Sequence, residues 1–303
     1  MQTTEKTMRE TVKKLFLDNK VDIVIGFQKS TVSDSGRPFF ARSVADADKL
    51  VWNDGCAANL AVFLPKLFEK PLRPREGFKP PRVGIIVKGC DGRSVSGLIK
   101  EKQALRDHLI IIGMPCAGMK TASKNRQEAA MLSRACVECA APQANGADIV
   151  IRGDSKKPAK SGYDRIKKFQ SLPAKERWER FIAEMSKCIR CNACRQACPN
   201  CYCAVCFADQ KKPSWTSQAA RLSDTIVFHM GRMFHQAGRC VECDACVNAC
   251  PMGVDLRLFT QKLAHDAHEL FGVTPGITPE ELPMLQTFKQ DDTECFITDP
   301  EEK

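Results

Sequence analysis

The chain has 303 residues, of which 43% are apolar and 27% are charged, and its formal net charge is +10. This composition is typical of a globular protein of about two domains, and it excludes a disordered or collagen-like chain. No apolar run approaches the roughly 20 residues that cross a bilayer, and the opening residues MQTTEKTMRE lack the apolar core of a signal peptide. We therefore expect a cytoplasmic protein without a membrane span.

The first half of the chain alternates apolar segments of strand length with stretches of helical pattern. Met8, Val12 and Leu15 fall at helical spacing, and a further helix is expected at 124–135. Continuous apolar strands that alternate with helices are typical of βαβ units and of a mostly parallel sheet. We therefore expect an α/β domain over residues 1–152. The expected strands lie at 21–26, 82–88, 108–113 and 148–152.

The residues that follow this domain are strongly basic. Positions 152–180 hold ten Lys or Arg residues against four Asp or Glu residues, and Ser161, Gly162 and Pro173 interrupt them. We interpret 153–173 as a linker that leads into a helix. Its charge has two interpretations, a solvated connection or a docking surface for an acidic partner.

The second half of the chain shows helical patterns only. Three sets of apolar residues recur at spacings of three and four, which indicates amphipathic helices. We expect a helical domain over 174–272, followed by a proline-rich acidic tail at 273–303 that is either mobile or ordered against a partner. The three sets are Trp178, Phe181, Ile182 and Met185; Leu222, Ile226, Met230 and Met233; and Leu256, Phe259, Leu263, Ala267 and Leu270.

The most unusual feature of the composition is its 17 cysteines. In a chain of this size without an export signal, they indicate metal rather than disulfides. Two runs of Cys-x₂-Cys-x₂-Cys-x₃-Cys-Pro begin at Cys188 and Cys240. This is the bacterial ferredoxin run, in which the fourth cysteine ligates the other cluster. The ligand sets expected for two [4Fe–4S] clusters are Cys188, Cys191, Cys194 with Cys250, and Cys240, Cys243, Cys246 with Cys198.

The connection between the two runs, at 199–239, is long and carries a helical pattern. A compact βαββαβ ferredoxin has a shorter connection. This half therefore resembles the α-helical ferredoxin domain of succinate dehydrogenase iron–sulfur subunits and heterodisulfide reductase small subunits, in which helices bracket two clusters. The expected fold class is an α/β domain joined to an α-helical ferredoxin-type two-cluster domain.

A second group of cysteines lies in the α/β half. Cys90 and Cys116 each follow an expected strand, and Cys136 and Cys139 form a CxxC shortly before the last strand. Because ligands bind outside the carboxyl ends of strands in open parallel sheets, these four side chains are candidates for a third [4Fe–4S] cluster. The alternative is that Cys90 and Cys116 are buried free thiols and that the CxxC binds nothing.

Bound clusters would also change how the net charge is interpreted. A four-iron cluster with four thiolates carries about −2, so three of them would lower the formal charge from +10 to about +4. The positive charge therefore does not indicate a nucleic-acid partner.

Several segments resemble the beta subunits of the coenzyme F-420 hydrogenase/dehydrogenase family, in their formate dehydrogenase version. The segments are GCAANLAVFLP, VGIIVKGCDGRSVSGLIKEKQ, IIIGMPCAGM and CVECAAPQANGADIVIRGD. The second half resembles the dicluster domain fused to bacterial and archaeal relatives. The resemblance implies a subunit that carries electrons between a catalytic subunit and a nucleotide-like acceptor, often through bound FAD. The sequence departs from the family because no GxGxxG follows a strand and the glycine-rich flavin segment is reduced to 54–59.

Eight to twelve candidate thiolates without an acid–base set favour electron transfer over bond-making. We expect an iron–sulfur subunit of an anaerobic formate dehydrogenase, hydrogenase or heterodisulfide reductase type complex, with other redox subunits as partners. One alternative is a flavin-dependent reductase that exchanges electrons between its clusters and a soluble acceptor. Another is a scaffold whose clusters only hold the fold.

Four cysteines outside these sets keep two interpretations. Cys201, Cys203 and Cys206 either bind a further metal together with Cys56 or pack as a thiol-rich edge of the cluster domain. The five histidines are scattered along the sequence, and each is expected to be a surface or core residue rather than a ligand.

Overall fold

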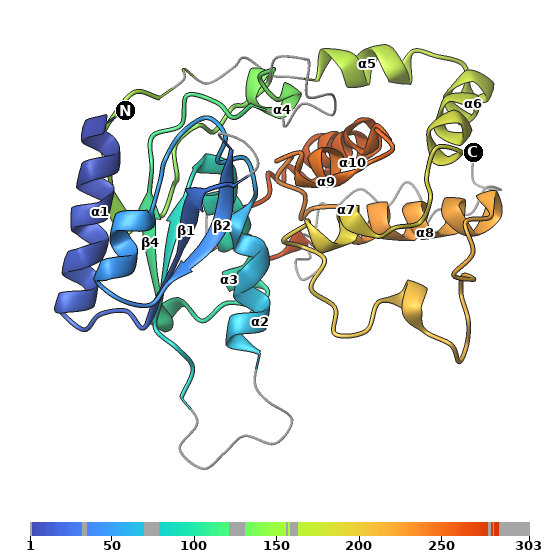
Figure 1. The fold of residues 1–303 in the computed structure, drawn as a ribbon. Helices are drawn as coiled ribbons and strands as arrows, with labels where there is room; N and C mark the ends of the chain where they lie inside the picture. Colours follow the sequence, from blue (N-terminus) through green and yellow to red (C-terminus); the bar gives the residue numbers. More distant parts are fainter. Residues whose placement is uncertain are drawn as a thin grey trace.

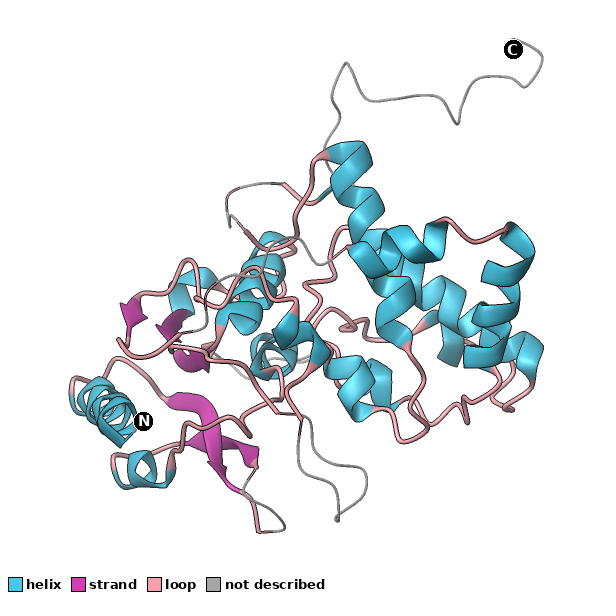
Figure 2. Cartoon of the chain, turned by 90° about the horizontal axis from the view of Figure 1, so that it is seen from above, coloured by secondary structure: helices cyan, strands magenta, loops and turns pink. Residues whose placement is uncertain are grey.

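The computed structural model describes residues 2–31, 35–69, 79–120, 131–155, 157, 163–277, 280 and 282–284. These residues form two lobes that lie side by side (Figure 1). One lobe contains the sheet, and the other is built from helices and loops (Figure 2). Among the described residues, no helix combines the length and the apolarity that a membrane span requires.

The first lobe contains a five-stranded sheet with the order β2-β1-β3-β4-β5. The neighbouring pairs β1–β3, β3–β4 and β4–β5 are parallel, whereas β1 and β2 are antiparallel. The prediction of an α/β fold with a mostly parallel sheet is therefore confirmed. The strands are β1 Ile23–Lys29, β2 Gly36–Ala41, β3 Val83–Val87, β4 Leu109–Gly113 and β5 Ile149–Val150.

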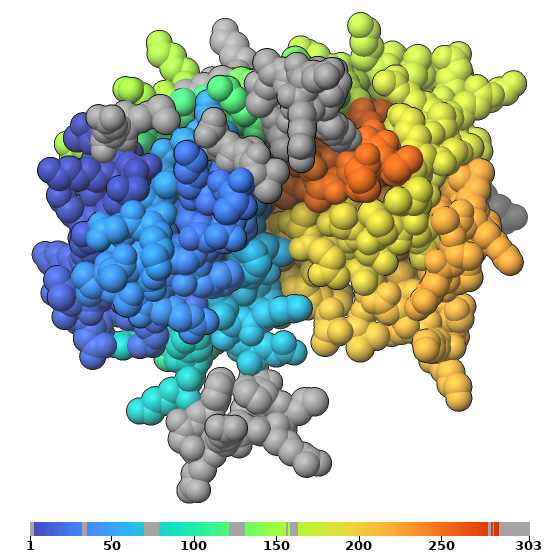
Figure 3. Space-filling model, viewed as in Figure 1, coloured from blue at the N-terminus to red at the C-terminus, as the bar shows by residue number. Residues whose placement is uncertain are grey.

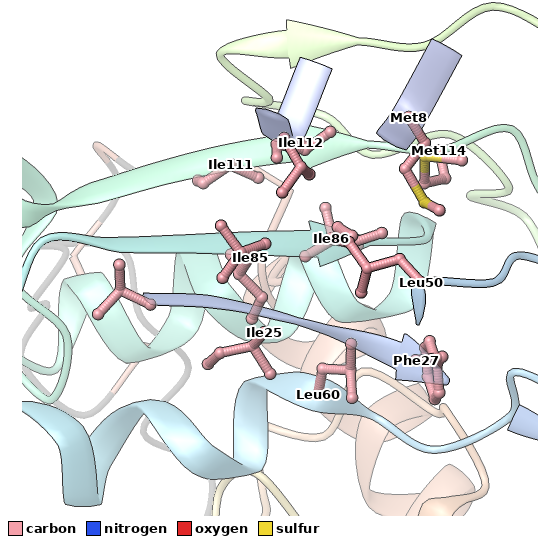
Figure 4. Close-up of a cluster of buried hydrophobic side chains, with 14 of the residues drawn as sticks. Met8, Ile25, Phe27, Leu50, Leu60, Ile85, Ile86, Ile111, Ile112 and Met114 are labelled. Carbon is pink, nitrogen blue, oxygen red and sulfur yellow. The ribbon is translucent and has the colours of Figure 1, made fainter. Parts of the chain in front are cut away.

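The central strands are buried because helices cover both faces of the sheet. Every residue of β3 is buried, as expected for the middle of a parallel sheet. Helix α1 covers one side, and α2 and α3 lie on the other (Figure 1). Isoleucine side chains from β1, β3 and β4 belong to one continuous core with Met8 of α1 and Leu60 (Figure 4). The helices are α1 Gln2–Leu17, α2 Leu64–Phe68, α3 Gly89–Lys100 and α4 Arg134–Val137, with 3-10 turns at Ala45–Lys49, Leu60–Phe63 and Arg106–His108.

Two local features of this lobe differ from the sequence prediction. Strand β2 was not expected, because its segment GRPFFA contains Pro38 and is only partly buried. Proline is tolerated there because β2 is an edge strand, paired on one side only. The helix expected at 124–135 lies largely outside the described residues, and only the short α4 is described near its end.

The second lobe is helical, as the periodic patterns predict, and no strand occurs among its described residues. Phe169, Phe181, Phe228 and Phe259 contribute to its separate hydrophobic core. The connection at 199–239 is helical only in its second part, because a long loop with one 3-10 turn precedes α8. The elements are α5 Asp164–Gln170, α6 Ala174–Met185, α7 Ala193–Gln196, the 3-10 turn Phe207–Asp209, α8 Leu222–His235, α9 Ala245–Ala249 and α10 Leu256–Phe271.

The segments expected to be a linker and a tail are partly built into the fold. Helix α5 lies within 153–173, and its Ile166 and Phe169 are buried in the second core. At the start of the tail, Pro275 and Gly276 are buried, and the Pro275 carbonyl accepts a hydrogen bond from Arg93 of α3. Residues 285–303 of the tail lie outside the described residues.

The two lobes touch along an extended seam (Figure 3). Arg239 Nε lies 2.6 Å from Glu101 Oε1, just beyond the end of α3, and Tyr202 donates a hydrogen bond to the same carboxylate. The ring of Tyr202 also packs against the core of the first lobe. This seam brings the carboxyl edge of the parallel sheet close to α9 and α10.

Candidate iron–sulfur sites

The cysteines expected to hold the first cluster surround one cavity of about 340 Å³. Three of them come from the loop around α7, and the fourth, Cys250, ends α9. Helices α7 and α9 pack together, which brings the end of the second run to the start of the first. The cysteines that line this first cavity are Cys188, Cys191, Cys194 and Cys250.

A second cavity of about 400 Å³ is built in the same way with the two runs exchanged. Cys198, the last cysteine of the first run, joins the three cysteines of the loop around α9. Each cavity therefore takes three thiols from one run and one from the other, which is the crossed arrangement expected from the ferredoxin spacing. The cysteines that line this second cavity are Cys198, Cys240, Cys243 and Cys246.

The two loops share an unusual backbone that aims their thiols inward. Arg190 and Asn192 have φ of 56° and 62°, and Glu242 and Asp244, at the same positions of the second run, have φ of 59° and 58°. The left-handed region costs a non-glycine residue roughly 1 kcal/mol or more, although Asn and Asp tolerate it better. Such strain is kept where the backbone has a function, and here it wraps each loop around a cavity.

This backbone also points amide donors at the sulfur atoms. The Arg190 N–H donates to Cys188 Sγ at 3.3 Å, and the Val254 N–H donates to Cys250 Sγ at 3.4 Å. Burial nevertheless raises the pKa of Cys246 to about 12 and that of Cys240 to about 11. The pKa of both thiols therefore lies well above neutral pH.

Helix α8 faces both cavities with polar side chains. His229 Nε2 lies 3.3 Å from Cys188 Sγ beside the first cavity. Cys198 Sγ donates to Gln236 Oε1 at 3.6 Å beside the second. Burial, followed by the charges of Arg232 and Arg190, lowers the pKa of His229 to about 4, so its imidazole is neutral near pH 7. His229 is a core residue, as predicted for the histidines, but it also contacts an expected cluster ligand.

The two cavities can be compared with the geometry that a single metal ion requires. Among the described residues, no three His, Cys, Asp or Glu side chains converge closely enough to hold one metal ion. Zinc requires its ligands at about 2.0–2.3 Å in a tetrahedron. The thiolates of a four-iron cube bind four different iron atoms and therefore stand farther apart.

A third and larger cavity, of about 1390 Å³, lies between the sheet edge and α10. Cys90 lies in the first turn of α3 after β3, and Cys116 follows the neighbouring parallel strand β4. Cys136 is part of α4, and Cys139 follows two residues after that helix ends. All four of these cysteines line the large cavity, so the fold brings together the residues expected from their positions at strand ends.

A buried ion pair supports the cysteine end of the large cavity. Lys88, also a lining residue, places Nζ 2.8 Å from Asp91 Oδ2 and donates to the Ala58 carbonyl at 2.7 Å. Burial raises the pKa of the Cys90 thiol, and Lys88 is the largest opposing influence. Lys88 therefore supplies a fixed positive charge where Cys90 and Cys116 would have to ionise.

The second cavity and the large cavity share one cysteine. Cys243 lines both of them, and its charge acts on the pKa of Cys90. Asn59 hydrogen-bonds Cys243 and also donates to Ser94 Oγ at 2.9 Å. Asn59 closes the segment 54–59 that resembles the flavin segment of the family, and of that segment only Ala57 lines the large cavity among the described residues.

A buried arginine joins the loops of these two cavities. Arg257, 4% exposed, lies 2.8 Å from Glu138 and 3.0 Å from Asp244, and a third carboxylate, that of Glu242, lies at 3.6 Å. Asp244 also accepts a hydrogen bond from the Ala135 amide at 3.1 Å. The sequence CVEC occurs at 136–139 and at 240–243, and the glutamate of each copy contacts the same arginine. This network fixes the CxxC of the large cavity against the second run.

The cysteines Cys56, Cys201, Cys203 and Cys206 are not brought together. Cys56 is buried in the first core, where it contacts Val51 and Asn53, whereas Cys206 packs against the second core. The structure therefore places Cys56 apart from the other three, contrary to the interpretation that it joins them on a metal ion. Cys201 lies beside the second cavity, where Gln236 Nε2 donates to its sulfur at 3.5 Å, and Cys203 is exposed.

Several site residues escaped sequence reasoning. Lys88 pairs with Asp91 at a helical spacing that is common for unlike charges, so the pair did not stand out in the sequence. Arg257 pairs with Glu138, which is far away in the sequence. The repeat of CVEC was a usable signal for the glutamates, because each glutamate occupies the same position between two cysteines in the sequence. His229 gave no signal beyond lying on a helix that the pattern already predicted.

No protein-family model matches the chain. Over 126 residues it is 27% identical to the F420-dependent formate dehydrogenase subunit beta of Methanocaldococcus jannaschii. The matched region covers 39% of this chain and 31% of that protein. Over 151 residues the chain is 30% identical to the F420-dependent formate dehydrogenase 1 subunit beta of Methanococcus maripaludis. The matched region covers 49% of this chain and 37% of that protein. The chain thus spans about a third of the length of each relative. These relatives confirm, for the part of the chain that they match, the predicted resemblance to the formate dehydrogenase beta subunit family.

Proposed function

We propose that this chain is the iron–sulfur electron-transfer subunit of an oxidoreductase complex of the formate dehydrogenase type. The names of the two relatives support this type of complex over the hydrogenase and heterodisulfide reductase types. In the proposal, the first and second cavities each hold a [4Fe–4S] cluster, and the cysteine end of the large cavity holds a third. The crossed sets of thiols and their amide donors fit such clusters.

The observation that carries the proposal is the position of Cys243. It lines both the second cavity and the large cavity, so these two cysteine sites adjoin, and the packing of α7 on α9 places the first cavity next to the second. Bound clusters would supply one-electron transfer, and the protein would fix their order and spacing. Arg257 holds the two loops that meet at Cys243, which keeps the distance between the second and third sites constant.

The first cavity, which lies at the other end of this series of cysteine sites, reaches the surface. Cys191 of the first cavity is exposed. Ile189 and Met252, which also line that cavity, are 53% and 44% exposed. Exposed apolar side chains beside a redox centre are typical of a contact with another protein. We propose that a partner redox subunit of the complex contacts this surface and exchanges electrons with the first cluster.

Metal analysis of the full chain, purified without oxygen, tests this function. We expect about twelve irons and twelve sulfides per chain, which corresponds to three four-iron clusters. About eight irons would support a carrier with two clusters and structural cysteines in the large cavity. A preparation that binds zinc and no iron after reconstitution would overturn the proposal.

A flavin-dependent reductase is a second candidate, because the large cavity is several times the size of either of the other two. Its volume of about 1390 Å³ compares with about 340 and 400 Å³ for the other two cavities. The first turn of α3 and the side chains of Arg93 and Lys167 also line it. A helix N-terminus with cationic side chains suits a phosphate group, so FAD would lie with its phosphates toward these residues and supply exchange between one- and two-electron steps.

Flavin content separates the two candidates. One FAD per chain, together with reduction of a soluble acceptor by the isolated chain, would favour the reductase. F420 is the first acceptor to assay, because both relatives carry it in their names. A flavin-free chain that holds iron and passes electrons only within a complex would favour the electron-transfer subunit.

A further inference from the structure

Helix α8 buries an arginine between the two runs of ferredoxin spacing. Arg232 is 4% exposed and lines the second cavity. Its Nη2 donates to the carbonyl of Cys194 at 3.1 Å, and Cys194 lines the first cavity. One guanidinium therefore contacts the walls of both cavities.

Apart from the bond of Nη2 to Cys194 and a hydrogen bond with Cys201, this guanidinium lacks the partners that a buried arginine usually has. Its Nε and Nη1 atoms have no hydrogen-bond partner among the described residues. The groups whose negative charge would act most strongly on it are cysteines from both sets and one neighbour, namely Cys246, Cys201, Cys198 and Cys194. Arg257, the other buried arginine of this lobe, lies within 3.6 Å of three carboxylates.

A buried cation is costly unless a negative charge compensates it. Four thiolates and a four-iron core carry a net negative charge that grows by one when the core accepts an electron. Two such centres next to each other repel, and the repulsion is largest when both are reduced. Arg232 stands at the place where one positive charge would compensate both.

We propose that Arg232 is a charge-compensating residue shared by the two clusters, which raises both reduction potentials and weakens the repulsion between the reduced centres. The inference rests on the proposed function, because it requires clusters in the first and second cavities. In each reduction step one electron enters one cluster from the redox partner, and Arg232 keeps its proton throughout. The free Nε–H and Nη1–H groups would donate to cluster or thiolate sulfur.

Redox titration followed by electron paramagnetic resonance tests this role on the full chain, purified without oxygen. The variants are Arg232→Gln, which removes the charge, and Arg232→Lys, which keeps it. Arg221→Gln removes an exposed charge at the start of the same helix and serves as the matched control.

We expect Arg232→Gln to lower the ratio of reduced to oxidised cluster at a fixed potential about tenfold for both clusters. This corresponds to a downward shift of about 59 mV for a one-electron couple. The two potentials should also move apart, because the second reduction loses its compensation. Arg232→Lys should restore most of the shift, and Arg221→Gln should behave like the unchanged protein.

Iron content makes the outcomes distinguishable. An unchanged protein that holds no four-iron cluster would overturn the proposed function and this inference together. Loaded variants whose potentials equal those of the unchanged protein would overturn the inference alone. If Arg232→Gln fails to retain iron, the lysine variant decides: iron retained with near-normal potentials supports charge compensation. Loss of iron in the lysine variant as well would make Arg232 a packing residue.

Discussion

The two lobes bring cysteines together by opposite means. In the helical lobe, three thiols of each set come from seven consecutive residues, and the strained backbone at Asn192 and Asp244 aims them into one cavity. In the α/β lobe, Cys90, Cys116 and the CxxC lie tens of residues apart in sequence and meet only because β3 and β4 are parallel neighbours.

This difference teaches how far each site depends on the rest of the fold. Each loop of the helical lobe carries three of its four thiols, so it keeps these three in place as long as the loop itself is intact. The large cavity depends on the sheet, on α4 and on the contact of Arg257 with both lobes. We therefore expect the two kinds of site to respond differently to substitution.

The largest effect should come from the crossed ligand of the second cavity. Cys198→Ala should remove about four of the irons in the helical lobe, because Cys198 is the thiol that the first run contributes to the second cavity. Cys203→Ala, which changes an exposed cysteine five residues later, is the matched control and should keep all irons. Equal loss of iron in both variants, measured by metal analysis and absorbance, would contradict the crossed ligand set.

The next effect concerns the α/β lobe alone. Cys136→Ala combined with Cys139→Ala should remove about four irons and leave the two clusters of the helical lobe in place. Cys203→Ala, which changes an exposed cysteine, controls for the loss of a thiol. Iron content that stays the same in the double variant would show that the large cavity holds no cluster.

A stability effect should follow from breaking the contact between the lobes. Arg257→Met leaves three buried or half-buried carboxylates without their cation, and we expect a loss of about 3–5 kcal/mol. Lys175→Met, which removes the exposed pair with Glu179, should change stability by less than about 0.5 kcal/mol. Denaturant unfolding without oxygen compares the two, and equal midpoints would argue against a clamp at Arg257.

The smallest effect should appear at the first cavity. His229→Phe removes a neutral ring nitrogen 3.3 Å from Cys188 Sγ but keeps an aromatic ring in the core. Loss of this hydrogen bond should lower the reduction potential of the first cluster by less than about 59 mV and leave that of the second cluster unchanged. A shift of about 59 mV corresponds to a tenfold change in the ratio of reduced to oxidised cluster. A shift confined to the second cluster would show that the assignment of His229 is wrong.

The sequence by itself was sufficient for the features that depend on local order. Apolar strands such as 82–88 predicted the buried parallel sheet, and the residues after them predicted which cysteines meet at its edge. The ferredoxin spacing predicted which cysteines share a cavity, because short gaps leave the thiols of one loop few directions to point. The helical periods of α6, α8 and α10 followed from the same kind of local pattern.

Only the tertiary structure decided how the lobes meet and which charges lie between the sites. The edge strand β2 pairs through its backbone, which side-chain pattern does not reveal. Arg232 and Arg257 look alike as single basic residues on helices, yet one is surrounded by thiols and the other by carboxylates. The physical reason is that the surroundings of a buried charge come from segments distant in sequence, and folding alone places them around it.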